Sequence, residues 1–593
     1  MKFDAKQLKD MSNAVRAWAV HAVRMARSGH VGIVLGAADV VTTVFANFMR
    51  FGRDRFVMSA GHGSALLYSV LKMCGYDVGD LNAFRKIGGP AGHPEYGTPG
   101  VDATTGPLGQ GVGNAVGLAL AEKINKTDAR VYCLCSDGDL MEGVAQESIA
   151  FAGRYGLNNL VLLWDDNGIS IDGAAMTDVD VAARMAAAGF HVLRVAGDDF
   201  AKINRALTAA QKSSSAPVFI QCCTQIGRGS SLAGKSKAHG NALSDSEMMQ
   251  LVEKYLCPRG ESLWAKVAAD KKDVFRAAAI ENIPNVSLPP VGEYVSTREL
   301  SGMYLNGLLK TGLRLIGGSA DLGGSTNVRV ENSREITADD FTGNYINYGV
   351  REHAMGAIMN GLSIAGLHPY GSTFLVFSDY MRPSIRLAAL SGLSVIYVFT
   401  HDSIAVGEDG PTHQPIEQLP SLRLIPGLNV FRPCNGLEVA YAWRRALADI
   451  SHPSAIILSR QAFKQIPTPL DVEIGRGAYI IHPARARRVR ATILATGSEV
   501  PLAVEVAARL GDAVQVVSVP SVADFRAQDS EYKNKMLAGF VVAIEAAASA
   551  PWFEFADAVV GIDNFGVSGP GAEVYARMGF DADIIARDIK AKM

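Results

Sequence analysis

The stretches Cys135-Ser136-Asp137-Gly138-Asp139 and Trp164-Asp165-Asp166-Asn167-Gly168-Ile169 decide the fold, because each ends a short apolar run with polar residues. We predict strands over 131–135 and 160–164 with a helix over 141–156 between them, which makes one β-α-β unit. A right-handed crossover puts the carboxyl ends of both strands at one edge of a parallel sheet. Asp137 and Asn167 can therefore meet there, and their oxygens suit Mg²⁺. Asp-Gly and Asn-Gly are also common turn sequences, so two surface turns are an equal alternative.

Composition limits the class of protein. The chain has 593 residues, 48% of them hydrophobic and 20% charged, which predicts several globular domains. The formal net charge of −2 gives no sign of a nucleic-acid or membrane partner. Residues 1–10 lack the apolar core of an export signal, and no apolar run is long enough to span a membrane. The seven cysteines are scattered without a Cys-x-x-Cys pair, which favours reduced thiols and a cytoplasmic location.

Three histidines of the first half fall on separate glycine-flanked loops: Ser28-Gly29-His30, Gly61-His62-Gly63-Ser64 and Gly92-His93-Pro94-Glu95. One histidine at a helix end is usually a cap or a turn, but three such loops favour a shared site over packing. The second loop precedes a predicted helix over 65–73, whose free N–H groups could bind an anion. The polar segment 226–241 contains His239, and composition alone favours a solvated loop there.

The second half has its own polar clusters. A composition change over 268–291 predicts a linker before a second domain. Glu352 precedes a helix over 354–366, where a carboxylate is favourable without any catalytic role. Phe374, Phe377 and Tyr380 recur every three residues, which is more typical of a core stripe than of a cofactor shelf. A strand over 394–400 precedes His401 and the glycine-rich loop 407–415, at the kind of strand end where open α/β sheets bind ligands.

The last part of the chain begins with an extended, basic crossing over 471–490. Strands are expected over 491–495, 513–519 and 539–545, with helices between them such as 499–510. No catalytic cluster is visible there, so we interpret it as a packing and assembly domain. The predicted fold class is α/β, with three domains whose parallel or mixed sheets are flanked by helices.

With these residues assembled, the chain resembles the transketolases, thiamine diphosphate enzymes that move two-carbon ketol units between sugar phosphates. The resemblance covers nearly the whole chain and rests on seven motifs in the family's order: 28–30, 61–64, 92–95, 106–111 (Gly-Pro-Leu-Gly-Gln-Gly), 165–173, 348–352 and 407–415. It implies a diphosphate- and Mg²⁺-binding domain at 1–285, a pyrimidine-binding domain at 292–465 and a C-terminal transketolase-type domain at 470–593. The first two would be thiamine diphosphate-binding folds.

The resemblance also implies a cofactor site. Mg²⁺, with Ca²⁺ or Mn²⁺ as substitutes, would be held by Asp137, Asn167 and the main-chain carbonyl of Ile169. Glu352 would come from the partner subunit and bond the aminopyrimidine nitrogen, so that the cofactor's own nitrogen can remove its C2 proton. Shielding from water would let this glutamate hold a proton. Phe377 would stack on the pyrimidine, which replaces the core-stripe interpretation. The implied cofactor-binding residues are His62, Gly106, Pro107, Leu108, Gly138, Asn167, Ile171, His239, Asp321, Glu352, Phe374, Phe377 and Tyr380.

The implied reaction is reversible transfer of a glycolaldehyde unit through a cofactor carbanion, in the pentose phosphate pathway, by a homodimer with its sites at the subunit interface. A ketose phosphate such as xylulose 5-phosphate would be the donor, and ribose 5-phosphate or erythrose 4-phosphate the acceptor. Histidines suit proton transfer near neutral pH, and arginines suit phosphate. The implied catalytic residues are Glu352, His413, His30, His93 and His239. The implied substrate-binding residues are His30, His93, His239, Arg298, Ser325, His401, Asp409, His413 and Arg460.

Three departures from the family's pattern stand out. Ser136 replaces a glycine, Val31 replaces a proline, and residues 234–238 (Gly-Lys-Ser-Lys-Ala) replace a His-Asp-Ser type of loop, so the position of His239 is open. Deoxyxylulose phosphate synthase is the nearest rival, but Asp409 and His413 favour transketolase. Dihydroxyacetone synthase shares most of the motifs. A non-catalytic homologue is disfavoured because Glu352, Asp137 and Asn167 are intact.

Overall fold

The computed structural model describes residues 2–176, 180–240, 243–268, 280, 282–288, 293–469 and 471–593. Most of the expected linker at 268–291 lies outside these residues. The chain forms two compact units: Met1–Ala277 with Thr337–Thr342 and Gly356–Leu367, and Ala278–Ile336 with Gly343–Met355 and His368–Met593. Among the described residues, no helix combines the length and the apolar character needed to cross a membrane.

A parallel five-stranded sheet forms the centre of the first unit, in the order β1-β2-β3-β5-β4. Ser136, at the end of β2, pairs with Asp165 near the end of β3. The polar residues that follow both strands therefore emerge at one edge, as the β-α-β prediction requires. The strands are β1 (Arg55–Met58), β2 (Val131–Ser136), β3 (Leu160–Asp166), β4 (His191–Ala196) and β5 (Val218–Cys223).

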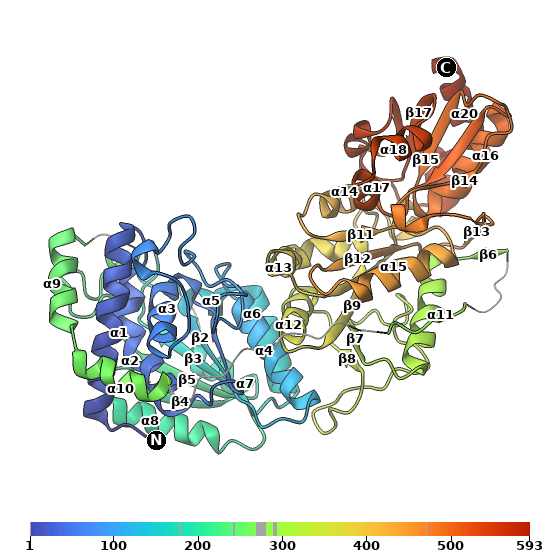
Figure 1. The fold of residues 1–593 in the computed structure, drawn as a ribbon. Helices are drawn as coiled ribbons and strands as arrows, with labels where there is room; N and C mark the ends of the chain where they lie inside the picture. Colours follow the sequence, from blue (N-terminus) through green and yellow to red (C-terminus); the bar gives the residue numbers. More distant parts are fainter. Residues whose placement is uncertain are drawn as a thin grey trace. The chain divides into compact units, whose positions relative to one another are not determined.

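Helices cover both faces of this sheet (Figure 1). They are α1 (Ala5–Ala26), α2 (Val31–Asn47), α3 (Ser64–Met73), α4 (Gln110–Ile124), α5 (Asp137–Met141), α6 (Gly143–Arg154), α7 (Val181–Ala187), α8 (Phe200–Gln211), α9 (Asp245–Tyr255) and α10 (Pro258–Ala268). Helix α2, for which the sequence analysis assigned no element, is buried from Val31 to Ala46. A helix that is apolar all round lacks the one-sided periodicity by which surface helices are found.

The helix expected over 141–156 corresponds to α6, which begins at Gly143 because Glu142 separates it from the short α5. Glu142 has an extended backbone, with φ −69° and ψ 136°. The side chains of Gln146 and Arg184 donate to the carbonyl of Leu140, which α5 leaves free at its end. The short α5 keeps Asp137 at the sheet edge.

The second unit contains a parallel six-stranded sheet in the order β11-β12-β10-β9-β7-β8 and a two-stranded antiparallel pair, β13-β6. The strands are β6 (Tyr294–Val295), β7 (Leu315–Ser319), β8 (Tyr345–Asn347), β9 (His368–Phe374), β10 (Ile396–Thr400), β11 (Asn429–Phe431), β12 (Ser454–Leu458) and β13 (Phe463–Lys464). The helices are α11 (Thr297–Lys310), α13 (Ser378–Leu390), α14 (Gln418–Arg423) and α15 (Gly436–Ala448). Helix α12 (Glu352–Ile364) begins in this unit and belongs to the first unit from Gly356 onward.

A mixed sheet completes the second unit, in the order β14-β16-β15-β17-β18, with β14 antiparallel to β16. The strands are β14 (Tyr479–His482), β15 (Ala491–Ala495), β16 (Val514–Ser518), β17 (Phe540–Ile544) and β18 (Ala558–Val560), and the helices are α16 (Val500–Leu510), α17 (Val522–Arg526), α18 (Ser530–Met536), α19 (Gly571–Arg577) and α20 (Ala582–Lys592). Strand β14 lies within the expected extended crossing. The α/β class with parallel and mixed sheets is confirmed.

Candidate active site

The side chain of Asp137 lies at the sheet edge of the first unit, and one of its carboxylate oxygens accepts no hydrogen bond within the described residues. Asp137 begins α5, is buried, and its Oδ2 atom has no hydrogen-bond partner among the described residues. Burial, followed by the nearby carboxylates of Asp165 and Asp166, raises its pKa to about 7. A buried carboxylate with a free oxygen and negative neighbours fits a bound cation, which would supply the missing partner.

Asn167, the second predicted metal ligand, is oriented by Asp165. Its Nδ2 atom donates to Asp165 Oδ2 at 2.9 Å, so the amide oxygen faces the other way and accepts from the Ile169 N–H at 3.0 Å. Thr224 holds the other oxygen of Asp165 through its hydroxyl. The sequence analysis missed this role of Asp165, although the acid stands two residues before the amide that it orients.

Asp139 joins three loops of this edge and explains Ser136. Its fully buried carboxylate accepts from Ser59 Oγ at 2.6 Å and from the Gly109 N–H at 2.7 Å. It also accepts from the Ser136 N–H and Oγ, both at 2.9 Å, and Ser136 caps α5. The serine that departs from the family's glycine therefore stabilises the turn that carries Asp137.

Four histidines meet in the first unit. His30 caps α2, His62 lies in a 3₁₀ turn over Gly61–Gly63, and His239 follows another over Ser236–Ala238. Ring centroids of His30 lie 5.3 Å from His62, 6.3 Å from His93 and 5.5 Å from His239, and His62 stacks on His239 at 5.0 Å. No group of three or more His, Cys, Asp or Glu residues in the described part of the chain has a metal-binding arrangement. The four rings form one cluster drawn from separate loops of the first unit.

Arg85, which the sequence analysis missed, holds two of these loops together. Its guanidinium donates to Ser28 Oγ at 2.8 Å and to the Gly92 carbonyl at 3.3 Å, and lies 3.3 Å from His30 Nδ1. Because a guanidinium only donates, His30 Nδ1 must be the acceptor, which leaves the proton on Nε2. Burial, then the charge of Arg85, lowers the pKa of His30 to about 4.

The segment before His239 packs against the start of α2 at some residues, while Lys235 and Lys237 are exposed as a solvated loop predicts. The Gly227 N–H donates to the Gly32 carbonyl at 3.0 Å, and Ala238 is buried. A Cβ atom at Gly32 would lie 2.4 Å from the Ala238 carbonyl oxygen, so only glycine allows this approach. Val31 begins α2 fully buried, a position that accepts valine as well as the family's proline.

The histidine cluster predicts acid sensitivity of the cofactor-free protein. Burial, then repulsion from the other histidines, lowers the pKa of His62 from 6.5 to about 3. Below pH 6.5 the unfolded histidine binds a proton that the folded one refuses, so the free energy of unfolding falls as pH drops from 6.5 towards 3. We expect His62→Gln to flatten this slope by up to about 1.4 kcal/mol per pH unit in chemical unfolding. The same change at exposed His191 is the control, and an equal slope in all three proteins would contradict the prediction.

Other predicted cofactor residues line the same edge. Gly61 and Gly106 approach so closely that a Cβ atom at Gly61 would lie 2.7 Å from the Gly106 nitrogen. A Cβ atom at Gly138 would lie 2.8 Å from Leu108 Cδ1, so these two residues are neighbours as well. Pro107 is exposed, and Ile171 is 73% exposed on a hairpin in which Ser170 donates to the Gly173 carbonyl.

In the second unit, Glu352 is buried at the start of α12. Burial raises the pKa of its carboxyl, and the Glu352 N–H and the Thr373 hydroxyl act in the opposite direction. Its raised pKa makes this carboxyl easier to protonate than an exposed glutamate. Asp321 lies beyond the end of β7, is exposed, and adopts a left-handed backbone with φ +63°.

The predicted aromatic residues form one cluster with two histidines. Phe374 stacks on His401 at 3.6 Å and on Phe377 at 5.9 Å between centroids. The edge of His413 meets Phe377 at 5.3 Å, and Tyr380 lies 6.1 Å from Phe377. Tyr380 is 63% exposed, so the three aromatic residues are not a core stripe. Phe374 is buried and stacked on His401 and Phe377, so a further ring could stack on the half-buried Phe377 or the exposed Tyr380.

Two arginines without a shared carboxylate lie near His401. Thr297 and Ser459 exchange backbone-to-hydroxyl hydrogen bonds of 3.0 and 2.8 Å, which ties the start of α11 to the end of β12. Arg298 and Arg460 follow these two residues. Burial, then Arg298 and Arg460, lowers the pKa of His401 to about 3, and burial also lowers the pKa of Arg298. A cationic pair of this kind favours a phosphate.

Two further predicted residues lie beside this pair. Arg298 Nη1 donates to the Ser325 carbonyl at 2.6 Å, and Ser325 is exposed. Asp409 is exposed at the end of the 3₁₀ turn Ile404–Asp409, four residues before His413. The structure therefore brings the second unit's predicted substrate residues to the loops that follow β7, β10 and β12.

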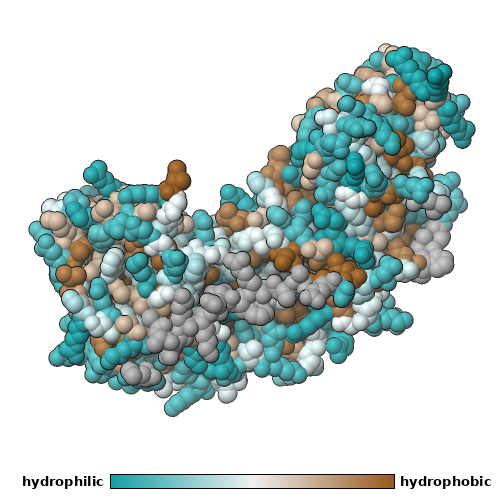
Figure 2. All heavy atoms as spheres, in the orientation of Figure 1, coloured by the Kyte–Doolittle hydropathy of each residue, from teal (hydrophilic) through white to brown (hydrophobic). Residues whose placement is uncertain are grey.

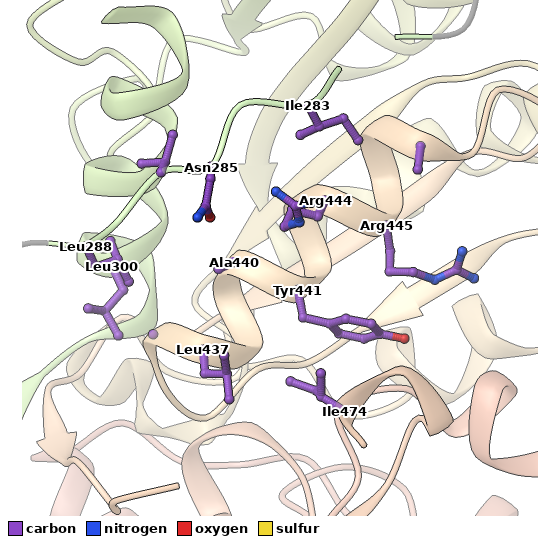
Figure 3. Close-up of a pocket in the computed structure, with 13 residues that line it drawn as sticks. Ile283, Asn285, Leu288, Leu300, Leu437, Ala440, Tyr441, Arg444, Arg445 and Ile474 are labelled. Carbon is purple, nitrogen blue, oxygen red and sulfur yellow. The ribbon is translucent and has the colours of Figure 1, made fainter. Parts of the chain in front are cut away.

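A cavity of about 770 Å³ elsewhere in the second unit is not the candidate site (Figure 3). Residues 283–288, α11 and α15 line it, with apolar side chains such as Leu288, Leu300 and Leu437 facing the space. Tyr441 and Arg445 turn to Asp524, at 2.8 and 3.4 Å. None of the predicted site residues lines this cavity.

Comparisons with known proteins agree with these features. The family "Transketolase, thiamine diphosphate binding domain" matches residues 7–281, and "Transketolase, pyrimidine binding domain" matches 293–465. "Transketolase-like TK C-terminal domain" matches 477–581. The transketolase of Bacillus subtilis (strain 168) is 40% identical over 656 aligned residues, which cover 97% of this chain and 98% of that protein.

Solved structures extend the agreement to three dimensions. The transketolase from Leishmania mexicana matches with a TM-score of 0.91 and 35% identity, covering 98% of this chain and 96% of the other. A transketolase from Pichia stipitis, in complex with sedoheptulose 7-phosphate, matches with a TM-score of 0.93 and 34% identity, covering 99% and 97%. The chain therefore belongs to the transketolase family of thiamine diphosphate-binding transferases.

Proposed function

We propose that this transketolase-family enzyme transfers a two-carbon ketol unit from xylulose 5-phosphate to ribose 5-phosphate or erythrose 4-phosphate, as in the pentose phosphate pathway. The observation that carries the choice of phosphorylated sugars is the pair Arg298 and Arg460 beside His401. Neither guanidinium forms an ion pair within the described residues, although the Glu299 carboxylate acts on Arg298. Structures of the Pichia stipitis relative are complexes with xylulose 5-phosphate and sedoheptulose 7-phosphate, which supports the same substrate class.

Thiamine diphosphate supplies the electron-accepting ring that lets a carbon–carbon bond beside a carbonyl break and form. We propose that Asp137, Asn167 and the Ile169 carbonyl hold Mg²⁺, which would bind the diphosphate. The unpaired Oδ2 of Asp137 and the fixed amide of Asn167 support this donor set. His62, the loop 106–108 and Gly138 would line the diphosphate, and Phe374, Phe377 and Tyr380 would enclose the pyrimidine.

The chain's own residues would manage protons and orientation. His30, with its proton on Nε2, His93 and His239 would exchange protons with the substrate's hydroxyls. His413, whose Nδ1 lies 2.9 Å from the Thr412 hydroxyl, would act from the second unit with Asp409. His30, His93 and His239 have lowered pKa values and are therefore neutral at pH 7. Because Nδ1 of His30 accepts from Arg85, His30 would act through the proton on its Nε2.

A coupled assay tests this function. Xylulose 5-phosphate and ribose 5-phosphate are supplied with and without thiamine diphosphate and Mg²⁺, and release of triose phosphate is followed. We expect release only with the cofactor, and no release would overturn the proposed reaction. A parallel reaction with formaldehyde in place of ribose 5-phosphate separates it from dihydroxyacetone synthase. A second reaction, with pyruvate as the donor and a triose phosphate as the acceptor, separates it from deoxyxylulose phosphate synthase.

We further propose a homodimer with each site shared between subunits, and a cytoplasmic location in line with seven cysteines that form no disulfide among the described residues. Apolar side chains are exposed near the predicted site in both units: Ile87 and Ile171 in the first, Val350 and Tyr380 in the second. Apolar residues also interrupt the largely hydrophilic face drawn in Figure 2. Such patches commonly mark an interface.

Mixing two inactive variants tests the shared site. Asp137→Asn and Glu352→Gln subunits are unfolded together, refolded and assayed. If Glu352 acts on the partner's cofactor, each mixed dimer has one intact site, and half of the dimers are mixed, so we expect about a quarter of wild-type activity. If each site lies within one subunit, the mixture stays inactive, and the shared-site proposal fails. Each variant refolded alone is the control.

A further inference from the structure

The loop that carries His401, Asp409 and His413 also packs against the C-terminal domain. We call residues 401–414 the substrate loop, because those three residues are proposed above to bind substrate. The core of the C-terminal domain (477–581) includes Ile404 and also Ile416, which lies just beyond the substrate loop. The Ile416 carbonyl accepts from the Ala548 N–H at 3.1 Å. The substrate loop is therefore packed as part of that domain's core.

A buried ionic network holds the start of the substrate loop. Arg432, fully buried, donates to Asp402 Oδ2 from Nε at 3.1 Å and from Nη2 at 2.8 Å. The same guanidinium reaches Glu499 and the Thr496 hydroxyl of the C-terminal domain. Glu545 lies 3.6 Å from Arg432, and Arg423 pairs with it through two hydrogen bonds of 2.8 Å. Asp402 is thus fixed to the C-terminal domain directly after His401.

Tyr575 of α19 links the C-terminal domain to Ser403, the residue after Asp402, through an uncharged hydroxyl. Its hydroxyl lies 2.8 Å from Glu499 Oε1 and 2.9 Å from Ser403 Oγ. A carboxylate only accepts, so Tyr575 donates to Glu499 and accepts from Ser403. Burial, then Glu499, raises the pKa of Tyr575 well above its usual value, which keeps this donor protonated.

The far end of the substrate loop is held by backbone contacts. Gln414 Nε2 donates to the Val567 carbonyl of the C-terminal domain at 2.9 Å and to the Gly407 carbonyl at 3.1 Å. Gly407 and Gly410 have φ +79° and +75°. A Cβ atom at Gly407 would lie 3.1 Å from the Gly569 oxygen, and one at Gly410 would lie 2.2 Å from Ser568 Oγ. Only glycine permits both the conformation and the approach.

We propose that the C-terminal domain positions the substrate loop, with Tyr575 as a positioning residue that acts through Ser403. The proposal rests on the proposed substrate-binding roles of His401, Asp409 and His413. The contacts flank these residues, at 402–403, at 407–410 and at 414. A loop held in one conformation before substrate arrives loses less entropy on binding, so the loop's anchors should affect sugar-phosphate affinity. This assigns the domain a role in the site that its sequence alone does not show.

Tyr575→Phe tests the proposal in the full-length holoenzyme, because it removes one hydroxyl and keeps the ring. Arg432 is unsuitable, since its loss would leave the buried carboxylates of Asp402 and Glu499 uncompensated. We expect KM for both sugar phosphates to rise about 3- to 10-fold, with kcat changed less than about twofold and the affinity for thiamine diphosphate unchanged. Ser403→Ala should raise KM similarly, and the double variant should not exceed the larger single effect.

Tyr532→Phe is the matched control, because Tyr532 donates to the Ala478 carbonyl at 2.7 Å within the same domain and is remote in sequence from the substrate loop. An unchanged KM in an active Tyr575→Phe enzyme would overturn the positioning role. So would additive effects in the double variant, or an equal rise in the Tyr532→Phe control. If the wild-type enzyme shows no ketol transfer, the proposed function fails instead, and the two failures are thereby distinguished.

Discussion

Glu352→Gln is expected to lower kcat by about 10²- to 10⁴-fold while the fold stays intact, because glutamine keeps the shape of the side chain but cannot hold or release a proton. Glu352 is buried at the start of α12, and burial raises the pKa of its carboxyl. A carboxyl in this environment is protonated more readily than an exposed one, which suits a hydrogen bond to a ring nitrogen. Steady-state kinetics with saturating thiamine diphosphate measure the effect.

The matched control for Glu352 is Glu331→Gln, which removes an exposed carboxylate from the same unit. We expect its kcat to stay within about twofold of wild type, since exposed surface changes are usually small in effect. Thermal unfolding of both variants should follow the wild-type curve closely. Near-normal turnover of Glu352→Gln would show that no proton at this carboxyl is needed, and the assigned role would be wrong.

Asp137→Asn is expected to have opposite effects on cofactor binding and on the stability of the cofactor-free protein. Removing the predicted metal carboxylate should weaken Mg²⁺-dependent binding of thiamine diphosphate by on the order of 10²-fold, equal to about 3 kcal/mol. In EDTA, however, the variant loses a buried, unpaired carboxylate oxygen beside Asp165 and Asp166. Its free energy of unfolding should then rise by about 1 to 2 kcal/mol.

Calorimetric titration of thiamine diphosphate with Mg²⁺ measures the first effect, and chemical unfolding in EDTA measures the second. Glu253→Gln, on the exposed side of α9, removes the same charge from the same unit and should change neither quantity. Unaltered cofactor affinity in Asp137→Asn would remove this residue from the metal site. A loss of stability in EDTA would show that the carboxylate has a structural partner instead.

Many of the candidate site residues could be predicted from apolar runs and turn residues along the chain. The apolar runs before Asp137 and Asn167 form neighbouring parallel strands, as expected. The glycine-flanked loops of His30, His62 and His93 converge, and the aromatic residues after β9 meet His401 and His413. Polar residues at strand ends are a local signal, and parallel topology brings such ends together. The roles of these residues in binding and catalysis stay predictions.

Other features depend on partners that are distant in sequence. No local sequence pattern singled out Asp139. Its carboxylate nevertheless accepts hydrogen bonds from Ser59 after β1, from Gly109 before α4 and from Ser136 at the end of β2. The guanidinium of Arg85 hydrogen-bonds to residues of both loops, Ser28 and Gly92. Arg85 itself has a left-handed backbone conformation. Helix α2 carries no one-sided periodicity because every face is buried. The helix expected over 141–156 is α6, but the short helix α5 before it, and the extended Glu142 between the two, were not apparent from propensity.

The sequence by itself determined the strand ends, the glycine-rich loops and the chemical types of the site residues, because hydrophobic runs and turn residues act over a few neighbours. Only the tertiary structure decided which of those groups are buried, which are paired and which oxygen is left free. Ser136 appeared as an unexplained substitution and is the cap of α5, and Asp137 beside it keeps an unpaired oxygen. Burial and hydrogen-bond pairing depend on segments far apart in the chain, so they exist only once the chain has packed.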